Sequence, residues 1–427
     1  MCGTASAGAR LVPYLAAPKG CAQPTGGTGG GRDDSVRAVG GRAWLRAAPA
    51  ILALAYGGNH FSVLLLLYRA REGYTSVQVD LLFALYIVGI IPGFLVAGPL
   101  SDRYGRRPLL VAGVVLACLG SIVLAADPAS VPVLGIGRLV SGVSVALAMV
   151  VGSSWVKELS ADVPGPVAAR RASLTLTAGF GLGPLVSGLL ARVAPAPTVL
   201  PYVVHVVLTV AAGVVLVRAV ETRPPSGEPR RPLLADLGVP VAARRRFLGV
   251  ILPSAPWVFG CAGLAFAVTP GLVAARIGSG GVLYATLLAV VTLACGAAIQ
   301  PFAVGIGRVT GGRQLVVGLG LVVVGVLLVA LESVVRAPPL GVPVAAVLGA
   351  AYGLCLVAGL TEVQRMARPD DLAGVTAVYY SLTYIGFVVP VLLAALTAVA
   401  PGPVLLLALA ALAATSLGVV AARIRTA

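Results

Sequence analysis

Charged residues are scarce in this sequence, at 11% of the chain, whereas hydrophobic residues make up 58%. A soluble domain carries about 25% charged residues, with which it covers its surface. A chain of 427 residues that is this poor in charge cannot build such a surface, so most of it must face lipid. The scarcity argues against a soluble protein and indicates an integral membrane protein in a lipid bilayer.

Acidic residues are scarcer still, because 15 Asp and Glu stand against 31 Lys and Arg. The resulting net charge of +16 would suggest a nucleic-acid partner if the protein were soluble. In a membrane protein the excess has a simpler cause, since positive charges collect in the loops on one side of the bilayer. We therefore expect no nucleic-acid partner.

Cysteine and histidine are too few and too scattered to form a metal centre. Of the six Cys, Cys2 and Cys21 lie near the start of the chain and the others lie inside apolar runs. Their spacing matches no metal or redox motif. We therefore expect no bound metal.

Long apolar runs occupy most of the chain after residue 45. A helix needs about 20 apolar residues to cross about 30 Å of hydrocarbon. The sequence therefore predicts an all-α membrane protein with twelve transmembrane helices in two six-helix halves. The predicted spans are residues 47–67, 77–97, 109–126, 131–153, 172–191, 199–219, 248–272, 281–303, 315–335, 342–362, 374–398 and 402–422.

The polar segments divide the chain into four parts. Residues 1–44 are rich in Gly, Ala and Ser without a long apolar core, which predicts a disordered cytoplasmic tail or a misassigned start and not a signal peptide. Residues 45–222 form the predicted N-terminal bundle and residues 223–246 a basic cytoplasmic central loop. Residues 247–427 form the predicted C-terminal bundle with a short cytoplasmic tail.

The basic residues are distributed unequally between the two sides of the membrane. Nearly all of them fall in the tails and in the loops on the side of the termini, which predicts cytoplasmic termini in a multi-pass plasma-membrane protein. The exceptions are Arg69, Arg71, Arg192, Arg276, Arg336 and Arg138, the last of which lies within a span.

A dense charged stretch, residues 98–107, lies between the second and third predicted spans. A generic positive loop would explain its arginines but not Asp102 or the glycines. The spacing G-x-L-x-D-R-x-G-R-R resembles the signature loop of the major facilitator superfamily of secondary transporters. This resemblance implies two six-helix bundles and a conformational latch made of Gly98, Asp102, Arg103, Gly105, Arg106 and Arg107.

In that family the latch loop abuts the start of the eleventh helix, here near residues 373–374. The resemblance implies that Asp102 faces this helix N-terminus when the cytoplasmic side is closed. A carboxylate there is stabilised by the helix dipole, by about 0.3–1 kcal/mol. The latch is then a gating device and not a substrate site.

Arg138 lies within the fourth predicted span and is followed by Gly142. The pair resembles the R-x-x-x-G motif of the family's fourth helix, which is associated with proton coupling. A charge inside a span usually faces the protein interior or a watery cavity. The alternative is an arginine whose side chain snorkels outward to the headgroups.

Asn59 and His60 interrupt the first predicted span at a depth similar to that of Arg138. Histidine changes charge near neutral pH, so His60 could carry a coupling proton; the alternative is a neutral ring that is hydrogen-bonded to the backbone. We predict that Arg138, His60 and Asn59 serve proton coupling, with Asp80 at the outer end of the second span as the nearest acid. The absence of an acid at mid-membrane favours neutral or anionic substrates over dications.

The fifth predicted span contains Gly179, Gly183, Pro184 and Gly188, a pattern that resembles the glycine–proline motif of the family's antiporters. The resemblance implies export; the alternative is ordinary packing of small residues.

Aromatic residues in the second half are candidates for substrate binding, because a central cleft that is lined by rings suits an apolar or aromatic substrate. We predict this role for Trp257, Tyr380 and Tyr384. Packing and interfacial belts are the alternative for each of them.

These patterns favour a monomeric secondary transporter that exports a small organic molecule by proton antiport. No Walker-type nucleotide loop occurs, so we expect no cofactor, with the proton gradient as the energy source. The first alternative is uptake or uncoupled facilitation of a small metabolite by the same fold. Others are a sensor that does not transport and a membrane enzyme, although no span carries the clustered acids and histidines that an enzyme would need.

Overall fold

The computed structural model describes residues 42–223, 241–367 and 372–425. Every regular element within them is helical, as the apolar runs predict. Most of the predicted N-terminal tail and of the predicted central loop lies outside the described residues.

The N-terminal half supplies six helical spans. Its first and fourth spans are interrupted helices, in which a short 3₁₀ or π segment joins two α-helical pieces. Its elements are η1 (Ala43–Arg46), α2 (Ala48–Asn59), η2 (Ser62–Leu64), α3 (Leu65–Glu72), α4 (Ser76–Tyr104), α5 (Arg106–Ala126), α6 (Val131–Leu147), η3 (Ala148–Gly152), α7 (Ser153–Glu158), α8 (Gly165–Val193) and α9 (Leu200–Leu216).

The C-terminal half also supplies six spans. Its elements are α10 (Val241–Arg246), η4 (Phe247–Ile251), α11 (Leu252–Gly263), η5 (Leu264–Val268), α12 (Thr269–Leu272), α13 (Ala274–Ile277), η6 (Gly278–Gly280), α14 (Gly281–Ile299), η7 (Gln300–Phe302), α15 (Ala303–Val309), α16 (Gln314–Val335), α17 (Pro338–Met366), α18 (Leu372–Ile385), η8 (Gly386–Val388), α19 (Val389–Leu396) and α20 (Gly402–Arg425).

The described residues contain 11 helical segments that are long and apolar enough to cross a bilayer. The shorter apolar helix α9 adds one more, which confirms the predicted arrangement of twelve spans. One boundary differs from the prediction, because α4 continues through the charged stretch to Tyr104. Only Gly105, with φ of +97°, separates it from α5, so most of the expected loop is helical.

Glycines let neighbouring helices touch backbone to backbone within each half. A Cβ atom at Gly89 of α4 would lie 2.0 Å from the carbonyl oxygen of Leu139 in α6, and one at Gly142 would lie 2.2 Å from that of Tyr86. The C-terminal half repeats this contact between α14 and α17, where a Cβ at Gly353 would lie 2.0 Å from the Gly296 oxygen. Small residues at helix interfaces permit such close approach in membrane bundles.

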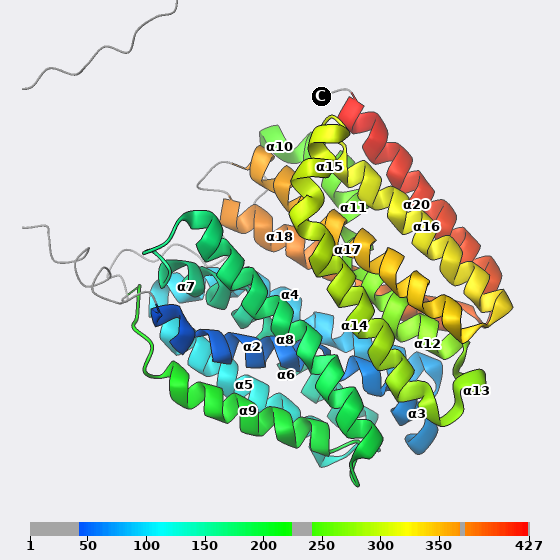
Figure 1. The fold of residues 1–427 in the computed structure, drawn as a ribbon, viewed down its shortest axis with the longest axis horizontal. Helices are drawn as coiled ribbons and strands as arrows, with labels where there is room; N and C mark the ends of the chain where they lie inside the picture. Colours follow the sequence, from blue (N-terminus) through cyan, green and yellow to red (C-terminus); the bar gives the residue numbers. More distant parts are fainter. Residues whose placement is uncertain (1–41, 224–240, 368–371, 426–427) are drawn as a thin grey trace, which may run out of the picture.

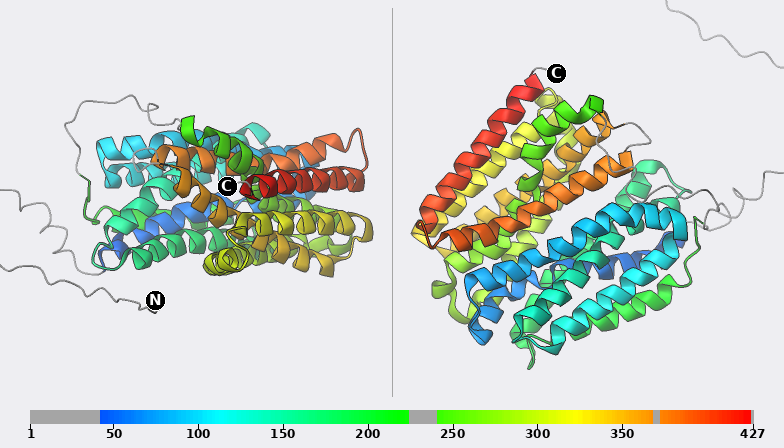
Figure 2. Two further views of the ribbon diagram at one scale, coloured as in Figure 1. Left: turned by 90° about the horizontal axis from the view of Figure 1, so that it is seen from above. Right: turned by 180° about the vertical axis from the view of Figure 1, so that it is seen from behind.

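The two bundles lie side by side and converge at one end (Figure 1). We call the face where α2 begins and α20 ends the termini face, and the other the opposite face. Near the opposite face the bundles pack tightly, since a Cβ at Gly188 of α8 would collide with Thr286 of α14, and the Phe83 ring lies 4.8 Å from that of Phe387. Toward the termini face the bundles diverge, as Figure 1 and the right view of Figure 2 show.

Candidate functional site

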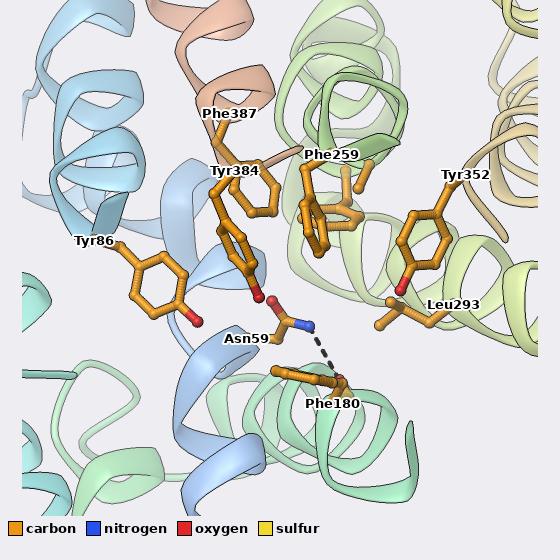
Figure 3. Close-up of a pocket in the computed structure, with 10 residues that line it drawn as sticks. Asn59, Tyr86, Phe180, Phe259, Leu293, Tyr352, Tyr384 and Phe387 are labelled. Atoms are coloured by element: carbon orange, nitrogen blue, oxygen red, sulfur yellow. Dashed lines mark hydrogen bonds between the residues drawn. The ribbon is translucent and has the colours of Figure 1, made fainter. Parts of the chain in front are cut away.

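A cavity lies between the two bundles and is lined by side chains of both (Figure 3). Its free space is about 20 Å³, which is room for about one water molecule, so a larger occupant must displace side chains of the wall. None of its lining residues is charged. They are Asn59, Tyr86 and Phe180 from the N-terminal bundle and Phe259, Ala262, Phe266, Leu293, Tyr352, Tyr384 and Phe387 from the C-terminal bundle.

Aromatic rings make up most of the cavity wall. The Tyr384 ring lies 4.1 Å from that of Phe259, and the Phe259 ring lies 5.0 Å from that of Phe387. The Tyr384 hydroxyl donates to Met149 Sδ of the other bundle at 3.2 Å. Tyr384 therefore lies where the sequence predicts a substrate-binding residue.

The other two aromatic residues predicted for substrate binding lie elsewhere. Trp257 donates its indole N–H to Ser416 Oγ of α20 at 3.1 Å and does not line the cavity in this conformation, so its role in substrate binding stays a prediction. The Tyr380 ring packs 5.7 Å from Phe94 of α4 and also lies outside the lining. Sequence position could not reveal these orientations, since α11 and α18 each carry rings on several faces.

Asn59 is the one amide in the cavity wall, and its orientation follows from its partner. The Nδ2 atom lies 3.3 Å from the carbonyl oxygen of Phe180, which can only accept a hydrogen bond. The amide must therefore direct its NH₂ group to Phe180 and its oxygen away from it (Figure 3). Asn59 is also the last residue of α2, and its own carbonyl oxygen accepts from Ser62 Oγ at 2.6 Å.

His60 follows Asn59 but points into the N-terminal bundle, where it is fully buried. Its Nδ1 atom lies 2.6 Å from the carbonyl oxygen of Gly57, so Nδ1 carries the proton of the neutral ring. The Nε2 atom has no hydrogen-bond partner among the described residues. The ring therefore fits both interpretations made from the sequence. It is hydrogen-bonded to the backbone, as a structural histidine would be, and it keeps one free lone pair on Nε2, which a proton carrier needs.

His205 of α9 lies beside His60, with ring centroids 5.0 Å apart. Its Nε2 atom lies 2.9 Å from the Ala53 carbonyl oxygen, and its Nδ1 atom lies 2.6 Å from Ser121 Oγ. Both ring nitrogens are therefore occupied, which makes His205 a fixed structural neighbour of His60.

Arg138 is buried within the N-terminal bundle, with 1% of its surface exposed, so the snorkelling alternative is wrong. It donates from Nε to the Leu82 oxygen at 3.2 Å and from Nη2 to the Phe83 oxygen at 3.3 Å. Its guanidinium carbon lies 4.7 Å from the ring centroids of both Phe61 and Tyr86.

No acid in the described residues pairs with Arg138, and its Nη1 atom has no hydrogen-bond partner there. The cation is stabilised instead by the faces of two rings. One of these, Tyr86, also lines the cavity, so a single ring separates the buried charge from the cavity. Asp80 is buried on α4 nearer the opposite face and makes no hydrogen bond to Arg138 or His60 in the described structure.

The latch residues form an ion-pair network at the termini face. Asp102 Oδ1 lies 3.0 Å from Arg106 and 3.2 Å from Arg223, and Arg106 Nη2 lies 2.8 Å from Glu158. Arg103 stacks 5.0 Å above the ring of its neighbour Tyr104. All of these partners belong to the N-terminal half except Arg223, which is the first residue of the central loop.

The remaining latch residues shape the loop backbone. A Cβ at Gly98 would meet Val150 at 3.9 Å, an ordinary contact, whereas one at Gly105 would lie 2.7 Å from Glu221 Oε2. Arg107 contributes its backbone N–H, which donates to Glu221.

Glu221 is a structural residue that the sequence interpretation missed. Its carboxylate accepts from the backbone N–H groups of Arg106 at 3.0 Å and of Arg107 at 2.8 Å. These groups begin α5, and a carboxylate at a helix N-terminus satisfies free donors and complements the helix dipole. The contact joins residues 115 positions apart, so local capping patterns could not reveal it.

We expect Glu221→Ala to destabilise the protein by about 1 kcal/mol, because the start of α5 loses its capping carboxylate. The loss would appear as a lower unfolding temperature in detergent. Glu221→Gln keeps one acceptor oxygen and should lose less. Equal stability of wild type and Glu221→Ala would show that water replaces the cap.

The glycine–proline stretch of α8 packs against both bundles. Cβ atoms at Gly179 and Gly183 would each lie 2.4 Å from backbone oxygens of α2, those of Leu52 and Tyr56. Gly188, four residues beyond Pro184, allows the contact with Thr286 of α14. Close packing is therefore what these glycines provide in this conformation, and their link to antiport stays a prediction.

Comparison with known proteins supports the same arrangement. The family model described as Major Facilitator Superfamily matches residues 47–391. The chain is 27% identical over 151 residues to human solute carrier family 2, facilitated glucose transporter member 12, covering 35% of this chain and 24% of that protein. It is 29% identical over 90 residues to multidrug resistance protein MdtL of Klebsiella pneumoniae (strain 342), covering 21% and 23%.

These alignments span only about a quarter of each relative's length. A structural match extends over nearly the whole chain: the crystal structure of the nucleoside transporter NupG superimposes with a TM-score of 0.69. It covers 89% of this chain and 98% of that one at 10% identity, a likeness of fold alone.

Proposed function

The chain belongs to the Major Facilitator Superfamily, and from this we propose that it exports a small organic molecule by proton antiport with alternating access. It is a multi-pass membrane transporter of small molecules and not an enzyme. The direction of transport, the proton coupling and the class of substrate are the proposal. We further propose that one chain acts as a monomer, because both walls of the cavity come from the same chain.

The observation that carries the proposal is the cavity between bundles that meet at one face and diverge at the other. Alternating access requires a central site that opens to one side at a time. The basic residues gather at the termini face, so we assign it to the cytoplasm of a plasma membrane. This conformation is then the state that is open toward the cytoplasm.

The latch geometry agrees with this assignment. With the cytoplasmic side open, the Asp102 carboxylate pairs with Arg106 of its own bundle and with Arg223 at the start of the central loop. In the proposed cycle, closure brings the start of α18 to Asp102, and Arg223 releases it. The latch thus changes partner between the two states.

We propose His60 as the proton carrier. Its Nε2 atom is the free basic site of a buried imidazole, and the ring lies at the interruption of the first span, next to Asn59 in the cavity wall. A proton on Nε2 adds a second positive charge to the interior that already holds Arg138, so protonation changes the electrostatics beside the substrate site.

Two pairs of observations bear on the direction of transport. The glycine–proline stretch of α8 and the similarity to a protein named for multidrug resistance favour export. The absence of an acid from the cavity wall, together with the similarity to a protein named as a facilitated glucose transporter, favours the alternative of uptake or uncoupled facilitation.

Proteoliposomes that contain a pH dye would test the proposal with a panel of neutral, anionic and cationic compounds. We expect a compound-dependent pH change with wild type and with the control Thr415→Ala, whose hydroxyl bonds only within α20. We expect none with His60→Gln, because its side chain cannot take up a proton. Compound movement without proton movement in wild type would make this a facilitator and leave His60 a structural role.

A further inference from the structure

The amide of Asn59 presents one defined polar atom to the cavity. Because Nδ2 donates to the Phe180 carbonyl, the Oδ1 atom faces the cavity, on the side of Tyr384 (Figure 3). No described residue donates a hydrogen bond to this oxygen. The Tyr384 hydroxyl lies on that side of Asn59 but donates to Met149 Sδ (Figure 3). The cavity thus presents an acceptor that lacks a donor.

The charge around the cavity disfavours ions of either sign. A cation would find no acid in the wall and would be repelled by Arg138, which lies behind the ring of Tyr86. An anion would find no Lys or Arg side chain in the wall. It would therefore lose its hydration without gaining an ion-pair partner. An uncharged molecule avoids both costs.

The rings determine the shape of the occupant. Phe180 lies on one side of Asn59, and the packed rings of Tyr384, Phe259 and Phe387 lie on the other (Figure 3). Rings gain most from offset-stacked and edge-to-face contacts with another ring. A flat aromatic molecule that displaces these rings can make such contacts on both sides while its edge reaches Asn59.

We infer that the cavity selects uncharged aromatic molecules that carry a hydroxyl or N–H group, which donates a hydrogen bond to Asn59 Oδ1. The inference rests on the proposed function, in which this cavity is the substrate site. Asn59 is then a specificity-determining residue, and His60 beside it holds the proton.

Four naphthalene probes differ in the group that tests this selection: 1-naphthol, 1-methoxynaphthalene, 1-naphthoate and 1-naphthylmethylammonium. Binding to the purified full chain in detergent, at neutral pH and without a gradient, gives their affinities. We expect 1-naphthol to bind about tenfold more tightly than its methyl ether, which cannot donate. Both ions should bind more weakly than 1-naphthol.

The Asn59→Leu variant should bind 1-naphthol no better than the ether. Ser381→Ala is the control, because it removes a hydroxyl that bonds only within α18 and should keep the wild-type ratio. Equal wild-type affinities for 1-naphthol and its ether, or tighter binding of either ion, would overturn the inference. If Asn59→Leu does not fold, the four wild-type affinities decide alone.

The proposed function and this inference fail in different ways. Proton-coupled export of an ion, with no preference for 1-naphthol over its ether, would reject the inference and keep the function. Tight binding of 1-naphthol without any compound-dependent proton movement in proteoliposomes would keep the inference about selectivity and reject proton antiport.

Discussion

We expect Arg138→Met to abolish proton-coupled transport while leaving the fold as stable as wild type or more stable. Arg138 is a buried cation without an acid partner among the described residues, and its removal relieves the cost of desolvating a charge, which is on the order of several kcal/mol per buried ion. The two carbonyl oxygens that it contacts, those of Leu82 and Phe83, lie inside α4 and keep their helical partners. Methionine fits between two rings and makes favourable sulfur–aromatic contacts.

Two measurements on the same preparation test this expectation. The unfolding temperature in detergent should stay level or rise, and the compound-driven pH change in proteoliposomes should fall to the level of protein-free liposomes. Arg138→Lys keeps the charge but loses the planar stack on Phe61 and Tyr86, so we expect partial flux. A Met variant that transports like wild type would show that this charge has no part in coupling.

The second large effect is expected from Gly89→Ala, which should destabilise the protein by roughly 1–3 kcal/mol or more and also abolish transport. The added methyl group would lie 2.0 Å from the Leu139 carbonyl oxygen, so α4 and α6 must separate. The hydrogen bonds from Arg138 to α4 cross this same interface. A small change in helix spacing would therefore displace the buried cation and Tyr86 together.

Gly181→Ala is the matched control for this substitution. Gly181 also lies inside a helix, α8, but an added Cβ would meet nothing within 4 Å. The control should gain about 0.5–1 kcal/mol, because glycine costs that much in a helix interior relative to alanine. Comparable unfolding temperatures for the two variants would contradict the steric argument.

The sequence predicted the spans well because their signal is local. Each apolar run is long enough to cross a bilayer by itself, and the helices of the structure cover all twelve predicted runs. The charged stretch before Gly105 was expected to be a loop but is helical, because hydropathy marks where a helix leaves the membrane and not where it ends.

The site was only partly predictable. The rarity of polar residues in the spans identified Arg138, His60 and Asn59, but not that Asn59 faces the cavity while His60 faces the bundle interior. That difference depends on the interrupted helix between α2 and α3. Trp257 was assigned to the cavity by residue type alone, and the helix instead turns it toward Ser416.

By itself, then, the sequence determined the membrane class, the number of spans and the family resemblance, since these depend on hydropathy and spacing along the chain. Tertiary structure alone decided which side chains share a cavity, that Arg138 rests on two rings without an acid, and that Glu221 caps α5. The physical reason is that facing and long-range contact depend on how helices rotate and pack against one another. Glycines such as Gly89 set that packing through contacts with residues distant in the chain.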